Sequence, residues 1–206
     1  MKYLDKLKKE LNVNKKGLGF LIGISVIGFI FGCLFIIMIS KSDKLLVKEY
    51  IESFLKNLNN INYLDIFKNT FFNNLLFIII IFLLGMSVIG IPINIFYFFL
   101  KSFVLGFTMV SFILTYKIKG CLFSLLYVIP HNLINICIFT ILVYYSINFS
   151  ILLIYGITKK KNINFKIMMN KYLKILIINI FIILTTSIYE SFVLPNIMKS
   201  LMFLVK

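Results

Sequence analysis

Long uninterrupted runs of apolar residues are the feature that most constrains this chain. They cover residues 17–40, 71–91, 93–116, 121–157 and 175–194. A helix of about 20 apolar residues crosses the ~30 Å hydrocarbon core of a bilayer. Hydrophobic residues make up 61% of the sequence and charged residues 14%, which is far from the composition of a soluble domain. The sequence therefore predicts an all-α integral membrane protein and excludes a soluble globule.

Interruptions in these runs predict about five membrane-spanning helices. The first is 17–40, which follows a lysine-rich start but has no small-residue cleavage site, so we expect it to remain as an anchor. Gly90 and Pro92 then separate 71–91 from 93–116. Because ~45 continuous helical residues would be about twice the bilayer thickness, we predict a tight hairpin at this point.

The run 121–157 is also too long for one crossing, and Pro130 is the predicted break. We expect a short re-entrant or interfacial segment before the break and a span over 134–157 after it. The rival interpretation is two short spans divided near Thr140.

Lysine placement decides between these topologies and orients the chain. A second crossing near Thr140 would put the lysines of 159–174 outside, against the positive-inside tendency. With one crossing there, the last span is 175–194. We therefore expect a protein of the bacterial cell membrane with a cytoplasmic N-terminus and its C-terminus outside.

Two amphipathic segments flank the first span within what we expect to be a single transmembrane domain, 17–206. Residues 1–16 are predicted to be a basic amphipathic segment on the cytoplasmic surface. Residues 41–68 are predicted to lie outside, on the outer leaflet, over the bundle or against a partner helix. Their apolar positions are a possible partner platform: Val47, Ile51, Phe54, Leu58 and Ile61.

The charge balance indicates membrane lipids as partners and argues against nucleic acid. All 22 basic residues are lysines, and they flank the apolar runs in short clusters, the usual place for residues that meet anionic headgroups. Cys33, Cys121 and Cys137 lack the spacing of a metal site or redox pair, so we expect apolar filler, no metal and no cofactor.

Glycines in the first span predict close helix packing. Gly19 with Gly23, and Gly28 with Gly32, each form a small-xxx-small pair that lets two helix backbones approach. At ~100° per residue the two pairs lie on opposite faces, so the span is predicted to pack between two neighbours.

Ionisable residues within the predicted spans mark candidate sites, because charge in the membrane is costly. Lys101 and Glu190 are intramembrane charges that we expect to reach the interfaces, and a depth difference of roughly 12 Å argues against an ion pair between them. His131 lies at the Pro130 break. Its neighbours Asn132 and Asn135 are expected to satisfy the backbone groups freed there, with ion or substrate binding as the alternative.

No constellation of acid, base or nucleophile supports catalysis, so the sequence predicts a protein that is not an enzyme. Three stretches nevertheless resemble the stage II sporulation protein M family of endospore-forming bacteria. They are GISVIGFIFG in the first span, residues 85–106 with GIP, LKSF and LGFT, and Pro130-His131-Asn132. The family pattern often has a Glu where this chain has Asn135, which favours structural hydrogen bonding.

The resemblance implies a non-catalytic membrane scaffold of the engulfment machinery. It would assemble or localise peptidoglycan-degrading partners, stage II sporulation proteins D and P, at the septal membrane. The residues 47–61 would serve as the outer platform, the glycine faces would meet a partner's membrane anchor, and a homo-oligomer is possible. The competing interpretation is a transporter or permease-like subunit, because polar groups lie at breaks in apolar segments.

Overall fold

The computed structural model describes residues 15–57, 62–159 and 165–203, and nearly all of them are helical. In chain order the elements are α2 (Lys15–Met38), α3 (Lys41–Lys56), α4 (Tyr63–Gly85), α5 (Gly90–Phe123), the π-helical turn η2 (Ser124–Val128), α6 (Ile129–Lys159), α7 (Phe165–Ile188), the π-helical turn η3 (Tyr189–Val193) and α8 (Leu194–Phe203). The all-α prediction is confirmed for these residues.

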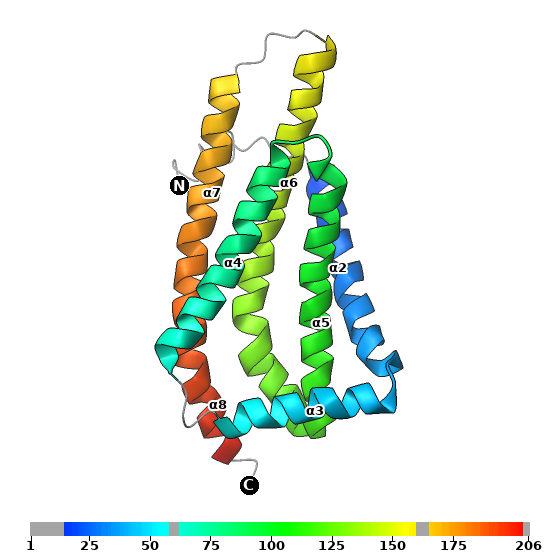
Figure 1. The fold of residues 1–206 in the computed structure, drawn as a ribbon, viewed down its shortest axis with the longest axis vertical. Coiled ribbons are helices and arrows are strands. Elements are labelled where there is room, and N and C mark those ends of the chain that lie inside the picture. The colour runs from blue at the N-terminus through cyan, green and yellow to red at the C-terminus, as the bar shows by residue number, and fades with distance from the viewer. Residues whose placement is uncertain (1–14, 58–61, 160–164, 204–206) are drawn as a thin grey trace.

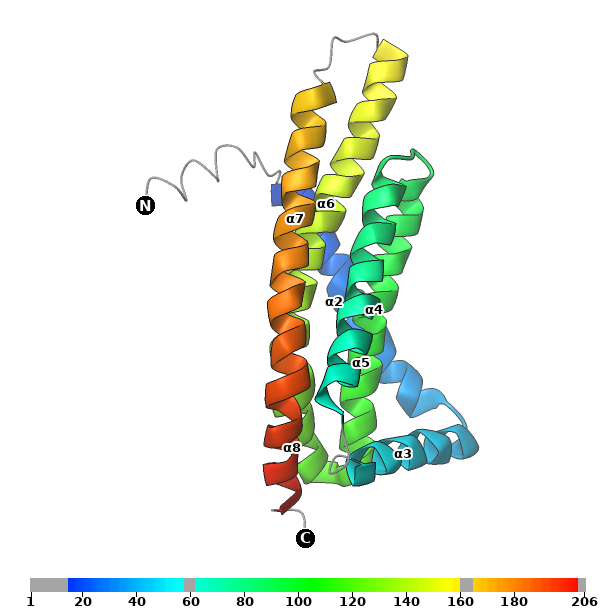
Figure 2. The same ribbon diagram turned by 60° about the vertical axis from the view of Figure 1, so that its left-hand side comes forward.

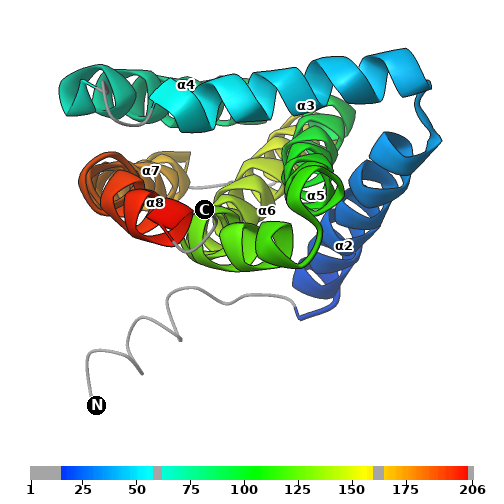
Figure 3. The same cartoon turned by 90° about the horizontal axis from the view of Figure 1, so that it is seen from below.

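The long helices α2, α4, α5, α6 and α7 run along a common axis (Figure 1). At one end lies the turn between α4 and α5. At the other end α3 lies across the bundle near α8, at a steep angle to the long helices (Figures 1 and 3). Many large apolar side chains point outward from this bundle, such as Phe31, Phe96 and Phe181, each more than half exposed. Such a surface is suited to lipid and not to water.

Four helical stretches of the described chain are long and apolar enough to cross a membrane. They are Lys15–Met38, Tyr63–Gly85, Gly90–Gly156 and Phe165–Ser200. The second begins eight residues before the predicted start at 71, because the turn of helix carrying Asp65 and Lys68 joins the apolar run without a break. Most of the predicted segment 1–16 lies outside the described residues.

Helix α2 packs chiefly against α5, and glycines set the distance between the two. A Cβ at Gly28 would lie 2.7 Å from the carbonyl oxygen of Phe99, and one at Gly32 would collide with the carbonyl of Phe103. From the other helix, Gly106 approaches the backbone of Phe29 in the same way. The packing predicted for Gly28 and Gly32 is therefore confirmed.

The face of α2 at Gly19 and Gly23 has no close neighbour among the described residues, although α2 contacts α6 as well as α5 elsewhere along its length. Ideal Cβ atoms at Gly19 and Gly23 meet nothing within 4 Å. Their face is open because α2 lies at the edge of the bundle, where only one side meets other helices (Figure 3). The packing predicted for Gly19 and Gly23 is therefore not found within the described part of the chain.

The predicted hairpin between the second and third runs is confirmed, a few residues earlier than expected. Helix α4 ends at Gly85 and α5 begins at Gly90, with the N–H of Gly90 donating to the carbonyl of Ser87 at 3.2 Å. A Cβ at Gly90 would collide with the carbonyl of Leu84, so the turn requires glycine. Pro92 lies in the first turn of α5, where its missing N–H costs little.

The chain reverses direction a second time at Lys117, and not at Pro130 as predicted. Lys117 has φ 54° and ψ −123°, which lie outside the helical region and divide α5 into two helical parts. The first part descends beside α2, and the chain then turns back to rise as α6 (Figure 1). A Cβ at Gly120 would collide with the carbonyl of Phe112, so the return also depends on a glycine.

Pro130 is accommodated inside a continuous helix. The π-helical turn η2 ends immediately before it, and the N–H of Ile129 donates to the carbonyl of Ser124, five residues earlier. Such a turn changes the hydrogen-bond register, so the missing donor of proline does not end the helix. The predicted interruption at Pro130–Asn132 was therefore wrong, and α6 begins at Ile129, five residues before the expected start of the span.

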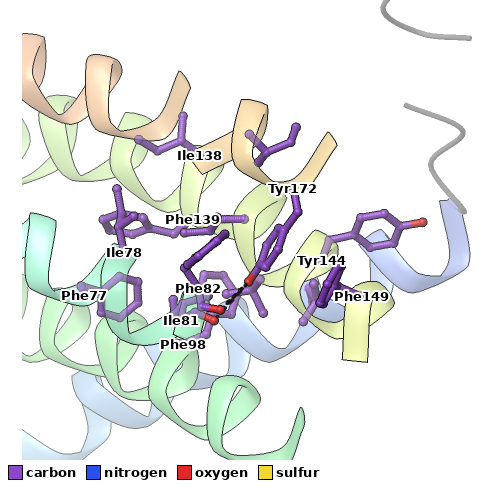
Figure 4. Close-up of a cluster of buried hydrophobic side chains, with 14 of the residues drawn as sticks. Phe77, Ile78, Ile81, Phe82, Phe98, Ile138, Phe139, Tyr144, Phe149 and Tyr172 are labelled. Carbon is purple, nitrogen blue, oxygen red and sulfur yellow. Dashed lines mark hydrogen bonds between the residues drawn. The ribbon is translucent and has the colours of Figure 1, made fainter. Parts of the chain in front are cut away.

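Aromatic and aliphatic side chains from α4, α5, α6 and α7 form the main core. Phe77, Phe98, Phe139 and Tyr172 are among its buried members (Figure 4). Tyr172 donates its hydroxyl to the carbonyl of Phe82 at 3.1 Å, so α7 is anchored to the last turns of α4. Hydrogen bonds of this kind matter in an apolar interior, where no water competes for the donor.

Helix α3 turns its apolar face to the bundle. The hydroxyl of Ser40 caps its start by accepting from the N–H of Asp43. Ile51 is buried, and Val47 and Phe54 are half-buried in a cluster with residues of α5, η2 and α8. The prediction that these residues form a platform for a partner is therefore wrong for Val47, Ile51 and Phe54, because their side chains already contact the bundle. Two of its positions, Leu58 and Ile61, lie outside the described residues.

We predict that Gly32→Leu destabilises the protein and Gly23→Leu does not. A side chain at position 32 must push α2 away from α5, and overpacking of this kind costs about 1–3 kcal/mol, whereas position 23 faces open space. Thermal unfolding of the purified variants in detergent measures the difference. Equal melting temperatures for the two variants would contradict the helix contact described above.

Candidate functional site

The three ionisable residues that the sequence placed inside the membrane lie close together in the bundle. Lys101 comes from α5, His131 from the first turn of α6, and Glu190 from η3, so three separate helical segments supply them. The Nε2 atom of His131 lies 3.5 Å from Oε2 of Glu190, and Glu190 and Lys101 attract each other electrostatically. We call these three residues the charged cluster.

Lys101 is held by one polar and two aromatic neighbours. Its Nζ donates to Oδ1 of Asn74 on α4 at 3.0 Å. The same ammonium group lies 5.4 Å from the ring centroid of Phe77 and 5.7 Å from that of Phe139. A cation over aromatic faces gains more where water is excluded. The prediction that Lys101 extends to the inner interface is therefore wrong.

The imidazole of His131 has two polar partners at the same nitrogen. Nε2 lies 2.9 Å from Nδ2 of Asn132 and 3.5 Å from the carboxyl of Glu190. A neutral ring accepts from the amide at Nε2, whereas a protonated ring donates from Nε2 to the carboxylate. Accepting from the amide requires the neutral tautomer with its hydrogen on Nδ1, and donating to the carboxylate requires a hydrogen on Nε2, which the other neutral tautomer and the charged imidazole both carry.

The predicted depth difference between Lys101 and Glu190 was wrong because the helix ends were misplaced. Helix α5 starts at Gly90, eleven residues before Lys101, which is ~16 Å along the axis. The last helix does not end at Pro195 but continues to Phe203, thirteen residues beyond Glu190, which is ~20 Å. Both residues therefore lie near mid-bundle.

Both π-helical turns of the described residues adjoin the charged cluster. Turn η2 ends three residues before His131, and η3 contains Glu190. The ring of Tyr127, in η2, lies edge-on to the imidazole at 6.2 Å. A π-helical turn changes the direction in which the following side chains point, and such turns are frequent at functional sites. Here they bring residues of different helices to one place.

Asn135 extends the polar region one turn further along α6. Its Oδ1 accepts a hydrogen bond of 2.8 Å from the hydroxyl of Thr186 on α7, and both side chains are buried. The prediction that Asn132 compensates a freed backbone group agrees with its amide donating to the carbonyl of Val128 at 2.9 Å.

Sequence reasoning missed the partners that these residues find across the bundle. Asn74 and Thr186 each bond one of the predicted residues, and the hydroxyl of Thr70 bonds the carboxyl of Glu190. Their only signal was a polar residue within an otherwise apolar run. Within the described ranges, no group of three His, Cys, Asp or Glu residues could hold a metal ion.

The arrangement is suited to holding helices together. A buried charge is costly alone, and removing one partner of a buried pair typically costs 3–5 kcal/mol. Lys101 bonds α4, and His131 contacts η3, so these residues link α4 with α5 and α6 with η3. The arrangement can also hold a proton at the imidazole or the carboxyl, because these are the groups in contact.

Fold and cluster together define a polytopic helical membrane protein with interacting charges in its interior. A comparison with protein families identifies it further: the model described as stage II sporulation protein M matches residues 21–195. The chain belongs to this family, whose name associates it with sporulation. Comparisons with curated proteins and with solved structures found no significant match.

We predict that Lys101 and Glu190 are energetically coupled. Lys101→Met alone should destabilise the protein by about 3–5 kcal/mol because it leaves a buried carboxylate without its cation. In the presence of Glu190→Gln the same change should cost less. A double-mutant cycle in detergent unfolding measures the coupling, with the exposed Lys174→Met as control. Additive effects of the two substitutions would show that they do not interact.

Proposed function

We propose that this protein is a non-catalytic membrane scaffold of the sporulation engulfment machinery. It would assemble or localise peptidoglycan-degrading partners at the septal membrane, with stage II sporulation proteins D and P as the expected partners. Family membership supports a role in sporulation. The observation that favours a scaffold is the charged cluster, because His131 contacts Glu190 and Lys101 bonds Asn74, so each charged residue has a partner within the protein without a substrate.

The proposal includes a topology of five spans, with the N-terminus in the cytoplasm and the C-terminus outside. The stretch Gly90–Gly156 counts as one apolar helix by composition, but its backbone reverses at Lys117. Counting two crossings there makes five. The lysines near residues 15 and 166–174 then share the cytoplasmic side, and α3 and α8 lie outside.

The outward face of α3 is the proposed contact surface for the partners. Because Val47, Ile51 and Phe54 contact the bundle, a partner would have to meet the exposed residues on the other side of the helix. Leu46, Glu49 and Ser53 are exposed and lie three or four residues apart, so they form one stripe along the helix. A partner with a membrane anchor would reach this stripe from the outer side of the membrane.

A transporter or permease-like subunit is the second candidate. It is favoured by the same cluster, since interacting ionisable groups beside irregular helix turns are common along transport pathways. The two candidate functions differ in the kind of molecule that the protein binds. A transporter is stabilised by its ligand in a thermal unfolding assay, whereas a scaffold is recovered with its partners.

We predict that the tagged protein, purified from membranes of sporulating cells, carries membrane-anchored peptidoglycan hydrolases identifiable by mass spectrometry. Leu46→Lys with Ser53→Lys should reduce their recovery about tenfold, which corresponds to ~1.4 kcal/mol of binding free energy. The matched control is Thr158→Lys with Asn170→Lys, which adds the same charge at the opposite end of the bundle. Failure of the unaltered protein to recover hydrolases would reject the scaffold function.

Labelling of single cysteines tests the five-span topology. The cysteines are introduced one at a time into a variant whose own three cysteines are replaced by serine. A cysteine at Lys56 should react with a membrane-impermeant maleimide in intact cells, because α3 lies outside. A cysteine at Lys166 should react only after the membrane is permeabilised. Labelling of both positions in intact cells would require an even number of crossings between them and contradict the five-span topology.

A further inference from the structure

A groove opens on the side of the bundle where α2, α3 and the lower part of α5 meet. The cavity has a volume of about 440 Å³. Its wall includes residues from the end of α2, the first half of α3 and the last turns of α5 before the reversal: Ile36, Ile37, Leu45, Val47, Ser111 and Leu114. We call this cavity the α3 groove.

The groove exists because α2 and α5 diverge as they approach α3. Their glycine contacts hold them together at Gly28 and Gly32, higher in the bundle. Below that point the two helices separate, and α3 closes the wedge from beneath (Figure 2). The opening therefore faces sideways, toward the lipid that surrounds the bundle.

The wall of the groove between α2 and α5 offers no free hydrogen-bond donor from its two hydroxyl-bearing residues, Ser111 and Thr115. Ser111 donates to the carbonyl of Phe107 at 2.6 Å, and Thr115 donates to the carbonyl of Ser111 at 2.8 Å. Both donors are thus used within their own helix. A hydrocarbon chain would meet no unpaired donor on these residues.

The rim of the groove is cationic. Lys41, Lys44 and Lys48 all line it, at the three- and four-residue spacing that places them along one side of α3. The acidic residues of the same helix, Asp43, Glu49 and Glu52, are absent from the lining, and the exposed pair of Lys48 with Glu52, at 3.7 Å, is one that an anionic headgroup would compete with. The Nζ of Lys44 donates to the carbonyl of Ile37 at 2.6 Å, which holds this ammonium group at the end of α2.

We propose that the α3 groove binds an anionic phospholipid. The phosphate would lie among the three lysines, and one acyl chain would enter between α2 and α5 past Leu114. Lysines near a membrane surface gain about 1 kcal/mol each from anionic lipid, and burial of acyl CH₂ groups adds to this. The site does not depend on the proposed scaffold function, because lipid binding requires no protein partner.

The chemistry of the groove favours a lipid over a helix of another protein. A phospholipid has an anionic phosphate that can meet the lysines and an acyl chain that can meet the apolar wall between α2 and α5. A soluble phosphate would use the lysines but leave the apolar wall without an occupant.

The test uses the full chain, purified without lipid in detergent, and native mass spectrometry with added phosphatidylglycerol or phosphatidylcholine. We expect phosphatidylglycerol to bind at least about tenfold more tightly than phosphatidylcholine, since the rim discriminates by charge. Lys41→Gln with Lys44→Gln and Lys48→Gln should abolish this preference. The control removes three lysines elsewhere, by Lys15→Gln with Lys166→Gln and Lys174→Gln, and should preserve it.

A second variant tests the apolar part without changing the charge. Leu114 is half exposed and lines the groove, so Leu114→Trp should block the acyl chain and weaken phosphatidylglycerol binding while all three lysines remain. If the triple lysine variant fails to fold, Leu114→Trp still tests the proposal. Melting temperatures of lipid-free protein establish which variants are folded.

Three outcomes would overturn the proposal. Equal binding of the two lipids would show an unselective crevice, and equal loss in the groove and control triples would show a general charge effect. Displacement of the lipid by soluble glycerol phosphate would show that the lysines bind a free phosphate instead.

Discussion

Inside a bilayer, a polar group must find its partner within the protein, and this constraint shapes the bundle. Lys101, His131 and Glu190 lie on different helical segments, and none has water to solvate it. They approach one another, and Asn74 completes the coordination of the lysine. The positions of α4, α5, α6 and the end of α7 follow from this requirement together with the aromatic packing around it.

Helix α2 is held in the bundle by different interactions from the other long helices. It contributes no charge to the cluster and is held by van der Waals contact at Gly28, Gly32 and Gly106, with a hydrogen bond of 2.9 Å between Ser25 and Ser102. Apolar side chains gain little from leaving lipid for protein, so close backbone approach has to supply the attraction. The divergence of α2 and α5 below this contact creates the α3 groove.

The proposed scaffold function fits a protein in which Lys101, His131 and Glu190 each find a partner among the protein's own residues. Such an interior can position surfaces without a ligand at these groups. The outward stripe of α3 and the open face at Gly19 and Gly23 are then available to other proteins, and the α3 groove to a lipid. In a transporter, the charged cluster would bind or pass a substrate. In a scaffold, the same residues would only hold the helices together.

The sequence by itself determined the helical class, the apolar runs, the hairpin at Gly90 and the three residues of the cluster, because each follows from local composition and spacing. It could not determine which helix faces meet. The third span was predicted to end at 116, directly before the reversal at Lys117, but the following run was predicted to break at Pro130, because proline is the stronger local signal. The similar depth of Lys101 and Glu190 was missed because depth was measured from misplaced helix ends. Only the tertiary structure decided these points, since they depend on distances between segments far apart in the chain.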